Sequence, residues 1–444
     1  MVSSLSWVKN ATVTCLILVL GIVVGFRYAV IGELPLGIRA AWFQQLLQKS
    51  ITSQSTNGSP AAQAGLTRSA LDQVTGQKAP PKTIQKKVDF DLFWETWAIL
   101  ERDYIEPEKI EANKMLDGAL MGMTASLDDP YTMYLPPKEN ERSGEDLAGS
   151  FFGVGMELGY VEENLAVVSP LDGTPAHKAG IQAGDLILHV KDAAKNLDED
   201  TTGWSLTKAV DAIRGQKGTY VDLTLYRKGE NAQPFVVSVQ RDEIVVKSVE
   251  LFMVENQGKK VAHLKISRFG ERTESEWNEA VKEILANKKQ LKGIVLDMRN
   301  NPGGFFDTSI ELASDFLAKE VVVQQKSRLT THEYRGNGSG RLKGIPLVVL
   351  VNKGSASASE ILAGALRDDL GIKLVGEKTF GKGTVQDRRE LSNGGGLHVT
   401  IARWLLPKGG WIHKEGIPVD VESKDDPETK EVDEALVAAM AQLP

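Results

Sequence analysis

The sequence predicts an α/β protein with one large mixed domain and two smaller regions ahead of it. Three short apolar runs rich in β-branched residues indicate buried strands, at 262–266, 294–296 and 347–351. Helical apolar spacing follows the first run, at 277–285, and the third, at 361–367. Repeated strand-helix units of this kind imply an α/β core.

Length and composition agree with several domains. The chain has 444 residues, of which 42% are hydrophobic, enough to fill two or three cores. Its 52 Lys and Arg against 59 Asp and Glu give a formal net charge of −7 without a long basic run, so nucleic acid is not an expected partner. Six scattered histidines and a single cysteine, Cys15, offer no basis for a metal site, and we expect no cofactor.

The N-terminus predicts a membrane location. After residues 1–10, an apolar run begins at residue 11 and continues past Arg27 to Ile31. If Arg27 reaches the interface, 11–31 lies at the short end of a membrane-spanning length. No Ala-x-Ala cleavage site follows, so we expect an uncleaved single-pass signal anchor with residues 1–10 in the cytoplasm; a cleaved signal peptide and lipidation at Cys15 are weaker alternatives.

The region after the anchor reads as a linker and then a small helical domain. Residues 32–87 become rich in Ser, Thr, Gln, Ala and Pro and lack apolar periodicity, which is typical of a flexible linker. Helical apolar spacing resumes at Leu92, Trp94, Trp97 and Leu100, in a domain expected over 88–144. The sequence Leu-Asp-Asp-Pro-Tyr-Thr at 127–132 closes the helical part, and we expect its role to be structural rather than chemical.

The strongest chemical signal is the turn after the strand at 347–351. Small residues at 354–359 join this strand to the helix at 361–367. Such a turn exposes a side chain at its tip and leaves the first N–H groups of the helix without partners, which suits a developing oxyanion. Serines 355, 357 and 359 all compete for the role of nucleophile, and an ordinary helix cap is the alternative reading.

A lysine between two glycines, Gly381-Lys382-Gly383, supplies a base for such a serine. Lysine accepts a proton only when neutral, so its ordinary pKa of roughly 10.4 must fall by about three units, which burial in an apolar pocket can provide. The pair predicts a serine nucleophile with a lysine base. A Ser-His-Asp triad assembled from distant residues remains an open alternative.

These elements together resemble the C-terminal processing, or tail-specific, serine peptidases, from about residue 90 to the end of the chain. The resemblance rests on Gly-Ser-Ala-Ser-Ala-Ser-Glu-Ile at 354–361, Gly-Glu-Lys-Thr-Phe-Gly-Lys-Gly-Thr-Val-Gln at 376–386 and the turn sequence Asn-Asn-Pro-Gly-Gly at 300–304. The residues that it implies are the nucleophile Ser357, the base Lys382, the orienting Gln386, and the oxyanion-hole N–H donors Gly303 and Ala358.

The fold that the resemblance implies for residues 244–444 is an α/β core related to the Clp-protease and crotonase superfamily, with a C-terminal helix. One departure lies near its end. Where the family commonly has Gly-Ile-x-Pro-Asp, this chain has Gly-Ile-Pro-Val-Asp at 416–420, which leaves the form of that local turn open.

Residues 145–243 resemble a PDZ domain. Alternating apolar residues at 221–225 and 235–239 flank a turn at 227–230 and predict an antiparallel hairpin. By resemblance, the loop at Phe152, Gly153, Val154, Gly155 and Met156 would receive a peptide carboxylate, beside an apolar groove lined by Leu206, Val210 and Ile213. An extended C-terminus would bind by strand addition. A PDZ domain that only packs and binds no peptide is the alternative.

Two other motifs carry little weight. Ser205-Leu206-Thr207-Lys208 spells the Ser-x-x-Lys of penicillin-recognising enzymes, but it lies in a helical segment and no Lys-Thr-Gly element follows. Gly153-Val154-Gly155 could open a dinucleotide fingerprint, but the next glycine is one position late and no helix start follows.

The sequence therefore predicts a membrane-anchored serine endopeptidase that cleaves proteins near free, apolar C-termini, with its catalytic domain outside the cytoplasmic membrane, although Arg27 and Arg39 weaken the positive-inside argument. A non-catalytic PDZ scaffold or apolar-ligand carrier on the same core is the alternative, and a crotonase-type enzyme is a more remote one. The oligomeric state stays open, a homo-oligomer included.

Overall fold

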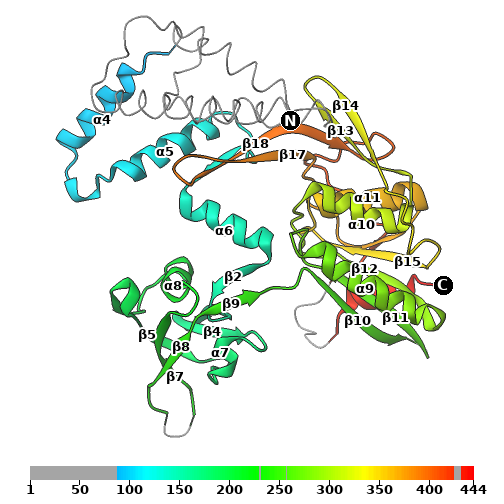
Figure 1. Ribbon diagram of the computed structural model, residues 1–444, viewed down its shortest axis with the longest axis horizontal. Helices are drawn as coiled ribbons and strands as arrows, with labels where there is room; N and C mark the ends of the chain where they lie inside the picture. The colour runs from blue at the N-terminus through cyan, green and yellow to red at the C-terminus, as the bar shows by residue number, and fades with distance from the viewer. Residues whose placement is uncertain (1–87, 230–231, 257, 425–431) are drawn as a thin grey trace, which may run out of the picture. The chain divides into compact units, whose positions relative to one another are not determined.

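The computed structural model describes residues 88–444 apart from 230–231, 257 and 425–431 (Figure 1). The expected anchor at 11–31 and linker at 32–87 lie outside the described residues. Within the described part of the chain, no helix combines the length and the hydropathy of a membrane span. Contacts divide the chain into two units, with the boundary after Pro107.

The described part of the first unit is one helix, α4 (Asp91–Asp103), which buries none of its residues. Its aromatic side chains pack on each other, with the Phe93 and Trp94 rings 5.0 Å apart and the Trp94 and Trp97 rings 6.2 Å apart. The helix that the apolar spacing predicts is therefore confirmed. No described part of the chain buries its apolar face.

The second unit opens with a short 3-10 helix, two α-helices and a strand. The short 3-10 helix η1 (Pro107–Lys109) leads into α5 (Ala112–Ala125), and β1 (Met133–Leu135) separates α5 from α6 (Pro137–Ala148). The helices agree with the helical region expected here. The strand was not expected: β1 pairs antiparallel with β18 (Gly396–Leu405), with Met133 opposite His398. The Asp-Pro-Tyr-Thr turn immediately before β1 is thereby attached to the second half of the chain.

The region that resembles a PDZ domain is built on a six-stranded sheet around its own apolar core (Figure 1). Its strands are β3 (Met156–Val161), β4 (Asn164–Pro170), β5 (Leu186–Asp192), β6 (Leu197–Asp200), β7 (Tyr220–Tyr226) and β8 (Phe235–Gln240). The predicted hairpin is confirmed, since β7 and β8 pair antiparallel with Val221 opposite Val239. A two-stranded ribbon of β2 (Ser150–Gly153) and β9 (Asp242–Val245) joins the entry and exit of the region.

Two short α-helices and one 3-10 helix complete this region: α7 (Pro175–Lys178), η2 (Ala193–Lys195) and α8 (Leu206–Ile213). Ser205 caps α8 by accepting a hydrogen bond from the N–H of Lys208 at 3.2 Å. The Ser-x-x-Lys sequence at 205–208 is therefore a helix start.

The large domain is centred on a mostly parallel six-stranded sheet in the order β10-β11-β12-β15-β16-β19. The strands are β10 (Val249–Asn256), β11 (Lys259–Ile266), β12 (Leu291–Asp297), β15 (Leu347–Val351), β16 (Leu374–Gly376) and β19 (Val421–Glu422), and only the β10–β11 pair is antiparallel. Strand-helix alternation thus gives the α/β core that the sequence predicts.

Period-two alternation sends neighbouring side chains of this sheet into two different cores. Ile294 and Leu296 pack with α9 (Thr273–Asn287), α10 (Phe306–Leu317) and α11 (Ala358–Leu370). Val295, between them, packs with the C-terminal helix α12 (Glu434–Ala441) on the opposite face. Helices therefore cover both faces of the sheet, and the strand ends carry the loops that form the site.

A second sheet of five strands lies at the end of this core. Its order is β1-β18-β13-β14, and β17 also pairs with β18. The strands not yet given are β13 (Val321–Ser327), β14 (Thr331–Arg335) and β17 (Thr384–Glu390). Figure 1 shows β17 and β18 running beside each other above α11. This sheet carries Gln386 on β17 and holds β1 at its edge.

The Gly-Ile-Pro-Val-Asp segment at 416–420 forms a turn that hydrogen bonds hold at both ends. The N–H of Ile417 donates to the hydroxyl of Thr379 at 2.7 Å, and the N–H of Leu374 donates to the carboxylate of Asp420 at 2.8 Å. The departure from the family pattern therefore leaves this turn bonded to the loop that precedes Lys382.

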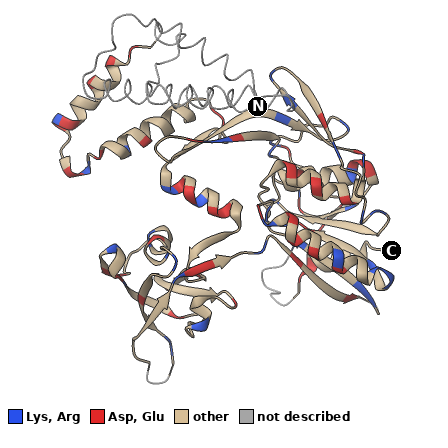
Figure 2. Cartoon of the chain, in the orientation of Figure 1, with Lys and Arg blue, Asp and Glu red and all other residues tan. Residues whose placement is uncertain are grey.

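Acidic and basic side chains are mixed over the described surface. Figure 2 shows both signs along α6 and α9, in agreement with the small net charge.

Candidate active site

The three serines of the turn before α11 have different surroundings. Ser355 is fully buried, and its hydroxyl donates to the carbonyl of Met298 at 2.7 Å. Ser359 is also fully buried, and its hydroxyl donates to the carbonyl of Asn301 at 2.9 Å. Both hydroxyls hold the 298–303 loop against the turn, whereas Ser357 between them is only half-buried.

The backbone of Ser357 is strained. Its φ is 56° and its ψ is −115°, values that a residue with a Cβ seldom adopts. Strain of this kind is found where a surrounding structure fixes a functional side chain at a sharp strand-to-helix turn. Among the three serines, Ser357 therefore has the geometry of a presented nucleophile.

A buried carboxylate ties this turn to the lysine loop. Glu360 has no exposed surface, and its Oε2 accepts from the N–H of Ser357 at 2.8 Å and from the N–H of Lys382 at 2.9 Å. Its Oε1 accepts from the hydroxyl of Thr379 and from the N–H of Gly381, both at 2.6 Å. Burial raises the pKa of Glu360, and these four hydrogen bonds oppose the rise. One side chain thus fixes the backbone at both residues of the expected dyad.

Gly303 lies against the nucleophile turn. Its φ is +100°, and a Cβ added there would lie 2.8 Å from the Cβ of Ser357 and 3.0 Å from the N of Ala358, so only glycine fits. The N–H of Gly303 donates to the side-chain oxygen of Asn301 at 2.9 Å. Donation to a substrate oxyanion would therefore have to share or replace that bond. Ala358 is the first residue of α11, so its N–H has no acceptor within the helix.

Ion pairs and hydrogen bonds hold the start of the loop that carries Gly303. Asp297, at the end of β12, accepts from Nε2 of His263 at 3.0 Å and from Nη2 of Arg299 at 2.8 Å. Nη2 of Arg299 also donates to Asp433, the N-cap of α12, at 2.7 Å. Burial alone would raise the pKa of Asp297, but the His263 and Arg299 hydrogen bonds and the Arg299 charge outweigh it and lower the pKa to about 2.

This depressed pKa predicts a loss of stability in acid. The free energy of unfolding should include a contribution from Asp297 that is complete above the ordinary aspartate pKa and is lost as pH falls through about 2. The fall of the Asp297 pKa from its ordinary value to about 2 corresponds to a contribution of roughly 2 to 3 kcal/mol. Asp297→Asn should therefore be less stable than the parent chain at pH 6, and urea unfolding should show that difference shrinking between pH 4 and pH 2. The exposed Asp172→Asn is the control, and a difference that is constant over this range would contradict the assignment.

Lys382 lies half-buried between Gly381, whose φ is +91°, and Gly383. Burial lowers the pKa of Lys382, and the charges of Asp129 and Glu360 oppose this by raising it. The net direction is the one that a lysine base requires. Nζ of Lys382 lies 5.1 Å from the centroid of the Tyr131 ring.

Gln386 is positioned by two threonine hydroxyls. Its Nε2 donates to Oγ1 of Thr384 at 2.9 Å and to Oγ1 of Thr400 at 3.1 Å. With both amide hydrogens engaged in this way, the side-chain oxygen is the atom of Gln386 that remains to accept a hydrogen bond from an amine.

Several residues around Lys382 were not expected from the sequence as parts of the site. The carbonyl of Lys382 accepts from Nε1 of Trp404 at 2.8 Å, and the carbonyl of Gly383 accepts from Nε1 of Trp411 at 2.8 Å. The turn with Asp129 and Tyr131, for which a structural role is expected, lies beside the lysine, with the Tyr131 ring over Nζ. The Asp-Pro-Tyr-Thr sequence was the available signal for this turn, and the Glu in Ser-x-x-Glu at 357–360 was the signal for Glu360.

The expected peptide groove combines an edge strand and a helix. β3 lies at the end of its sheet, so one edge of it is unpaired among the described strands. Gly155 has a φ of +76°, and its carbonyl accepts a hydrogen bond from the N–H of Leu171 at 3.0 Å. The N–H of Met156 belongs to the same trans peptide unit and therefore points the opposite way, toward the unpaired edge of β3. A backbone donor directed toward an unpaired strand edge suits a peptide carboxylate.

The other residues expected to bind a peptide differ in exposure. Phe152 is 45% exposed and Leu206 is 37% exposed, and Val210 is half-buried. Gly153 and Val154 are buried. Ile213 is only 4% exposed and packs in the core of the region, so its side chain supports α8 from within.

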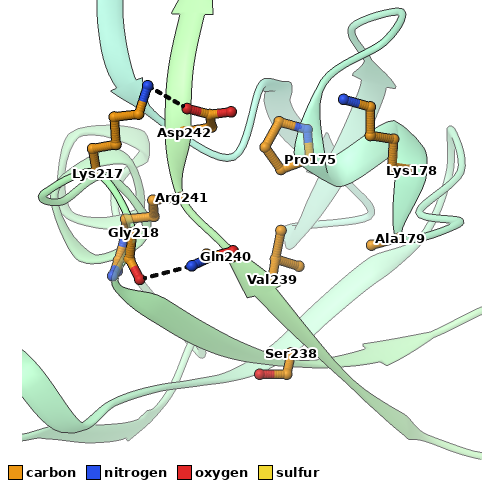
Figure 3. Close-up of a pocket in the computed structure, with 10 residues that line it drawn as sticks. All are labelled: Pro175, Lys178, Ala179, Lys217, Gly218, Ser238, Val239, Gln240, Arg241 and Asp242. Atoms are coloured by element: carbon orange, nitrogen blue, oxygen red, sulfur yellow. Dashed lines mark hydrogen bonds and ion pairs between the residues drawn. The ribbon is translucent and has the colours of Figure 1, made fainter.

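A hollow of about 500 Å³ lies on the same region, between α7 and β8. Figure 3 shows the Lys217–Asp242 ion pair and the hydrogen bond from Gln240 to Gly218 at its side. None of the residues expected to act on or bind a substrate lines it. In the described part of the chain, no cluster of three or more His, Cys, Asp or Glu side chains is arranged to hold a metal ion.

Comparison with known families divides the chain in three. The model described as "Peptidase family S41" matches residues 260–423, the PDZ domain model matches residues 144–226, and the "Activating protease CtpB N-terminal domain" model matches residues 55–139.

Curated relatives cover most of the chain. It is 36% identical over 352 residues to the carboxy-terminal processing protease CtpA of Bacillus subtilis, covering 79% of this chain and 72% of the relative. It is 34% identical over 328 residues to CtpB of the same organism, covering 74% of this chain and 66% of the relative. The crystal structure of a putative S41 protease from Bacteroides fragilis is similar in fold, with a TM-score of 0.50 and 16% identity over 82% of this chain and 97% of that one.

Proposed function

The chain belongs to the carboxy-terminal processing proteases of peptidase family S41, and from that premise we propose that Ser357 is its nucleophile and Lys382 the general base of an endopeptidase that cuts proteins near their C-termini. The observation that carries the proposal is the shared Glu360 carboxylate oxygen, which accepts hydrogen bonds from the backbone of both residues. The backbones of two residues separated by 24 others in sequence thereby share one acceptor, which supports their assignment to one site.

The proposed reaction proceeds through an acyl-enzyme. The neutral amine of Lys382 takes the proton of the Ser357 hydroxyl as the oxygen attacks the scissile carbonyl, and the resulting oxyanion lies against the N–H groups of Ala358 and Gly303. The ammonium of Lys382 then gives its proton to the leaving amine, and the peptide C–N bond breaks. A water molecule, deprotonated by Lys382, hydrolyses the ester and regenerates the serine. Gln386 orients the amine throughout without adding a negative charge that would hold its proton.

A fluorophosphonate probe tests this proposal against the non-catalytic alternative. The probe phosphonylates an activated serine, so it should label the parent chain at Ser357 and should not label Ser357→Ala. A chain whose site is silent, such as a scaffold or a ligand carrier, would remain unlabelled at every serine. Peptide mapping of the labelled protein would also reveal a different nucleophile.

For substrate selection, the proposal assigns the free C-terminus to the groove between β3 and α8. The N–H of Met156 directed to the unpaired edge, the exposed side chain of Leu206 and the half-buried side chain of Val210 support an apolar tail whose carboxylate is received by backbone donors. Strand addition at β3 would supply the remaining hydrogen bonds.

Amidating the substrate tail should lower kcat/KM at least about tenfold. A hydrogen bond to a charged group contributes about 1.5–3 kcal/mol, and 1.4 kcal/mol corresponds to a factor of ten. An Asp-Asp tail should have a similar effect because it places charge beside Leu206. The measurement compares one unfolded substrate with a free apolar tail, an amidated tail and an Asp-Asp tail. Equal kcat/KM for all three would show that the groove does not select the tail.

The proposed location is the outer side of the cytoplasmic membrane, with residues 11–31 as anchor. The apolar run and the flanking Lys9 in the sequence support this assignment. Fractionation of cells that express the full chain and a chain lacking residues 1–31 tests it. The full chain should remain with membranes after a high-salt wash, be digested by protease added to spheroplasts, and lose the membrane association on truncation.

A further inference from the structure

The turn at residues 129–132 lies far from Lys382 in sequence and next to it in the fold. The Tyr131 ring is half-buried, and its centroid is 5.1 Å from Nζ of Lys382. The same ring meets the His413 ring edge to face at 6.0 Å, and His413 stacks on Trp411 at 5.0 Å. Packed aromatic rings from two distant parts of the chain, Tyr131 and then His413 with Trp411, therefore lie on one side of the amine.

Hydrogen bonds from the next residues of the turn to the Asp129 side chain hold the turn together. Its carboxylate accepts from the N–H of Tyr131 at 3.1 Å and from the hydroxyl of Thr132 at 2.7 Å. Thr132 is buried and accepts in turn from the N–H of Thr400 on β18 at 3.0 Å. The pairing of β1 with β18 continues this attachment immediately after the turn.

A hydrogen-bond chain connects the turn to Gln386. The hydroxyl of Thr400 accepts from Nε2 of Gln386 at 3.1 Å and interacts with the Asp129 carboxylate. Burial would raise the pKa of Asp129, but the hydrogen bonds from Thr400, Thr132 and Tyr131 outweigh it, so the carboxyl stays ionised. An ionised Asp129 favours a Thr400 hydroxyl whose hydrogen points toward the carboxylate and whose oxygen accepts from the Gln386 amide.

We propose that the Asp129–Thr132 turn is a positioning element for Lys382, in which the Tyr131 ring shields the amine from water and Asp129 orients Gln386 through Thr400. The proposal rests on the proposed role of Lys382 as the base. It extends the site to the 129–132 turn, which precedes the PDZ region in the sequence. This turn covers the lysine although it lies outside the peptidase core as the sequence divides the chain.

The two side chains of the turn have opposite effects on the amine. The Tyr131 ring contributes to the burial that lowers the pKa of Lys382, whereas the negative charge of Asp129 raises it. The other titratable groups that face the amine are Glu360 from α11, whose charge also raises the pKa, and His398 from β18. Changes in the turn should therefore move the pH profile in a direction that depends on which residue is removed.

The experiment measures the rate of Ser357 phosphonylation by a fluorophosphonate and kcat/KM for a peptide substrate between pH 5 and pH 10. Tyr131→Ala should move the ascending limb of the profile, which reports Lys382, to higher pH, with a loss at pH 7 of about tenfold for each unit of displacement and recovery as pH rises. Tyr131→Phe keeps the ring and should retain the parent profile. Asp129→Asn should move the limb to lower pH and reduce the plateau, since Gln386 is less well oriented.

Matched controls separate this role from folding. Tyr220→Ala removes an exposed tyrosine on β7, far along the chain from the site, and should leave the profile unchanged. A loss in Tyr131→Ala that is equal at every pH, or a limb in Asp129→Asn that does not move, would mean that the turn only stabilises the fold and would overturn the proposal. Failure of the proposed function would be seen separately, as a Lys382→Met chain that still cleaves and labels.

Discussion

Replacing Ser357 by alanine is expected to lower kcat/KM by more than about 10⁴-fold, because the variant has no hydroxyl to form the acyl-enzyme and retains only binding and oxyanion stabilisation. The fold should be unaffected. Serine and alanine carry the same Cβ, so the backbone strain at φ 56° is unchanged, and the N–H of residue 357 still donates to Glu360. Steady-state cleavage of an unfolded protein substrate, followed by mass spectrometry of the products, measures the effect.

The matched control is Ser275→Ala, which removes an exposed serine on α9 and should cleave at the parent rate. Circular dichroism melts should give the same Tm for Ser357→Ala and the parent chain. If Ser357→Ala retains substantial turnover at an unchanged Tm, one of the neighbouring serines or a distant triad is the nucleophile, and the dyad assignment is wrong.

Lys382→Arg is expected to lose about 10²- to 10⁴-fold in kcat/KM, because a guanidinium keeps its proton at any accessible pH and cannot act as a base. In the parent chain, kcat/KM should rise with pH and level off above the pKa of Lys382. Burial lowers that pKa from its ordinary value, so the rise should be complete at a lower pH than for a solvated lysine. The pH dependence of kcat/KM over pH 5–10 measures this directly.

Lys382→Met is the companion variant, since it removes the charge and keeps the length of the side chain. It should be as inactive as Lys382→Arg. It should also be more stable than the parent chain near pH 7, because a lysine whose folded pKa is lowered destabilises the folded state at every pH below that pKa. The stability difference should shrink as pH rises toward the ordinary lysine value. Near-normal turnover in either variant would exclude lysine as the base.

Local patterns in the sequence were sufficient to predict many of the helices and strands. Period-two alternation at 221–225 and 235–239 predicted the hairpin of β7 and β8, and the β-branched run at 347–351 predicted β15. Small residues followed by helical spacing predicted the turn into α11. These features depend on contacts between near neighbours, which a linear sequence displays directly. The resemblance of three motifs to one peptidase family then supplied the candidate residues.

The sequence by itself thus determined the α/β class, the strand-to-helix turn with its serines, and the lysine between glycines. Only the tertiary structure decided which serine is presented, because Ser355 and Ser359 are distinguished from Ser357 by hydrogen bonds to carbonyls about 57 residues away. Only the fold brought Tyr131 to Lys382, across about 250 residues, and placed β1 in the sheet with β18. Such contacts depend on how separate elements pack and on where buried polar groups find partners, and neither periodicity nor local spacing records them.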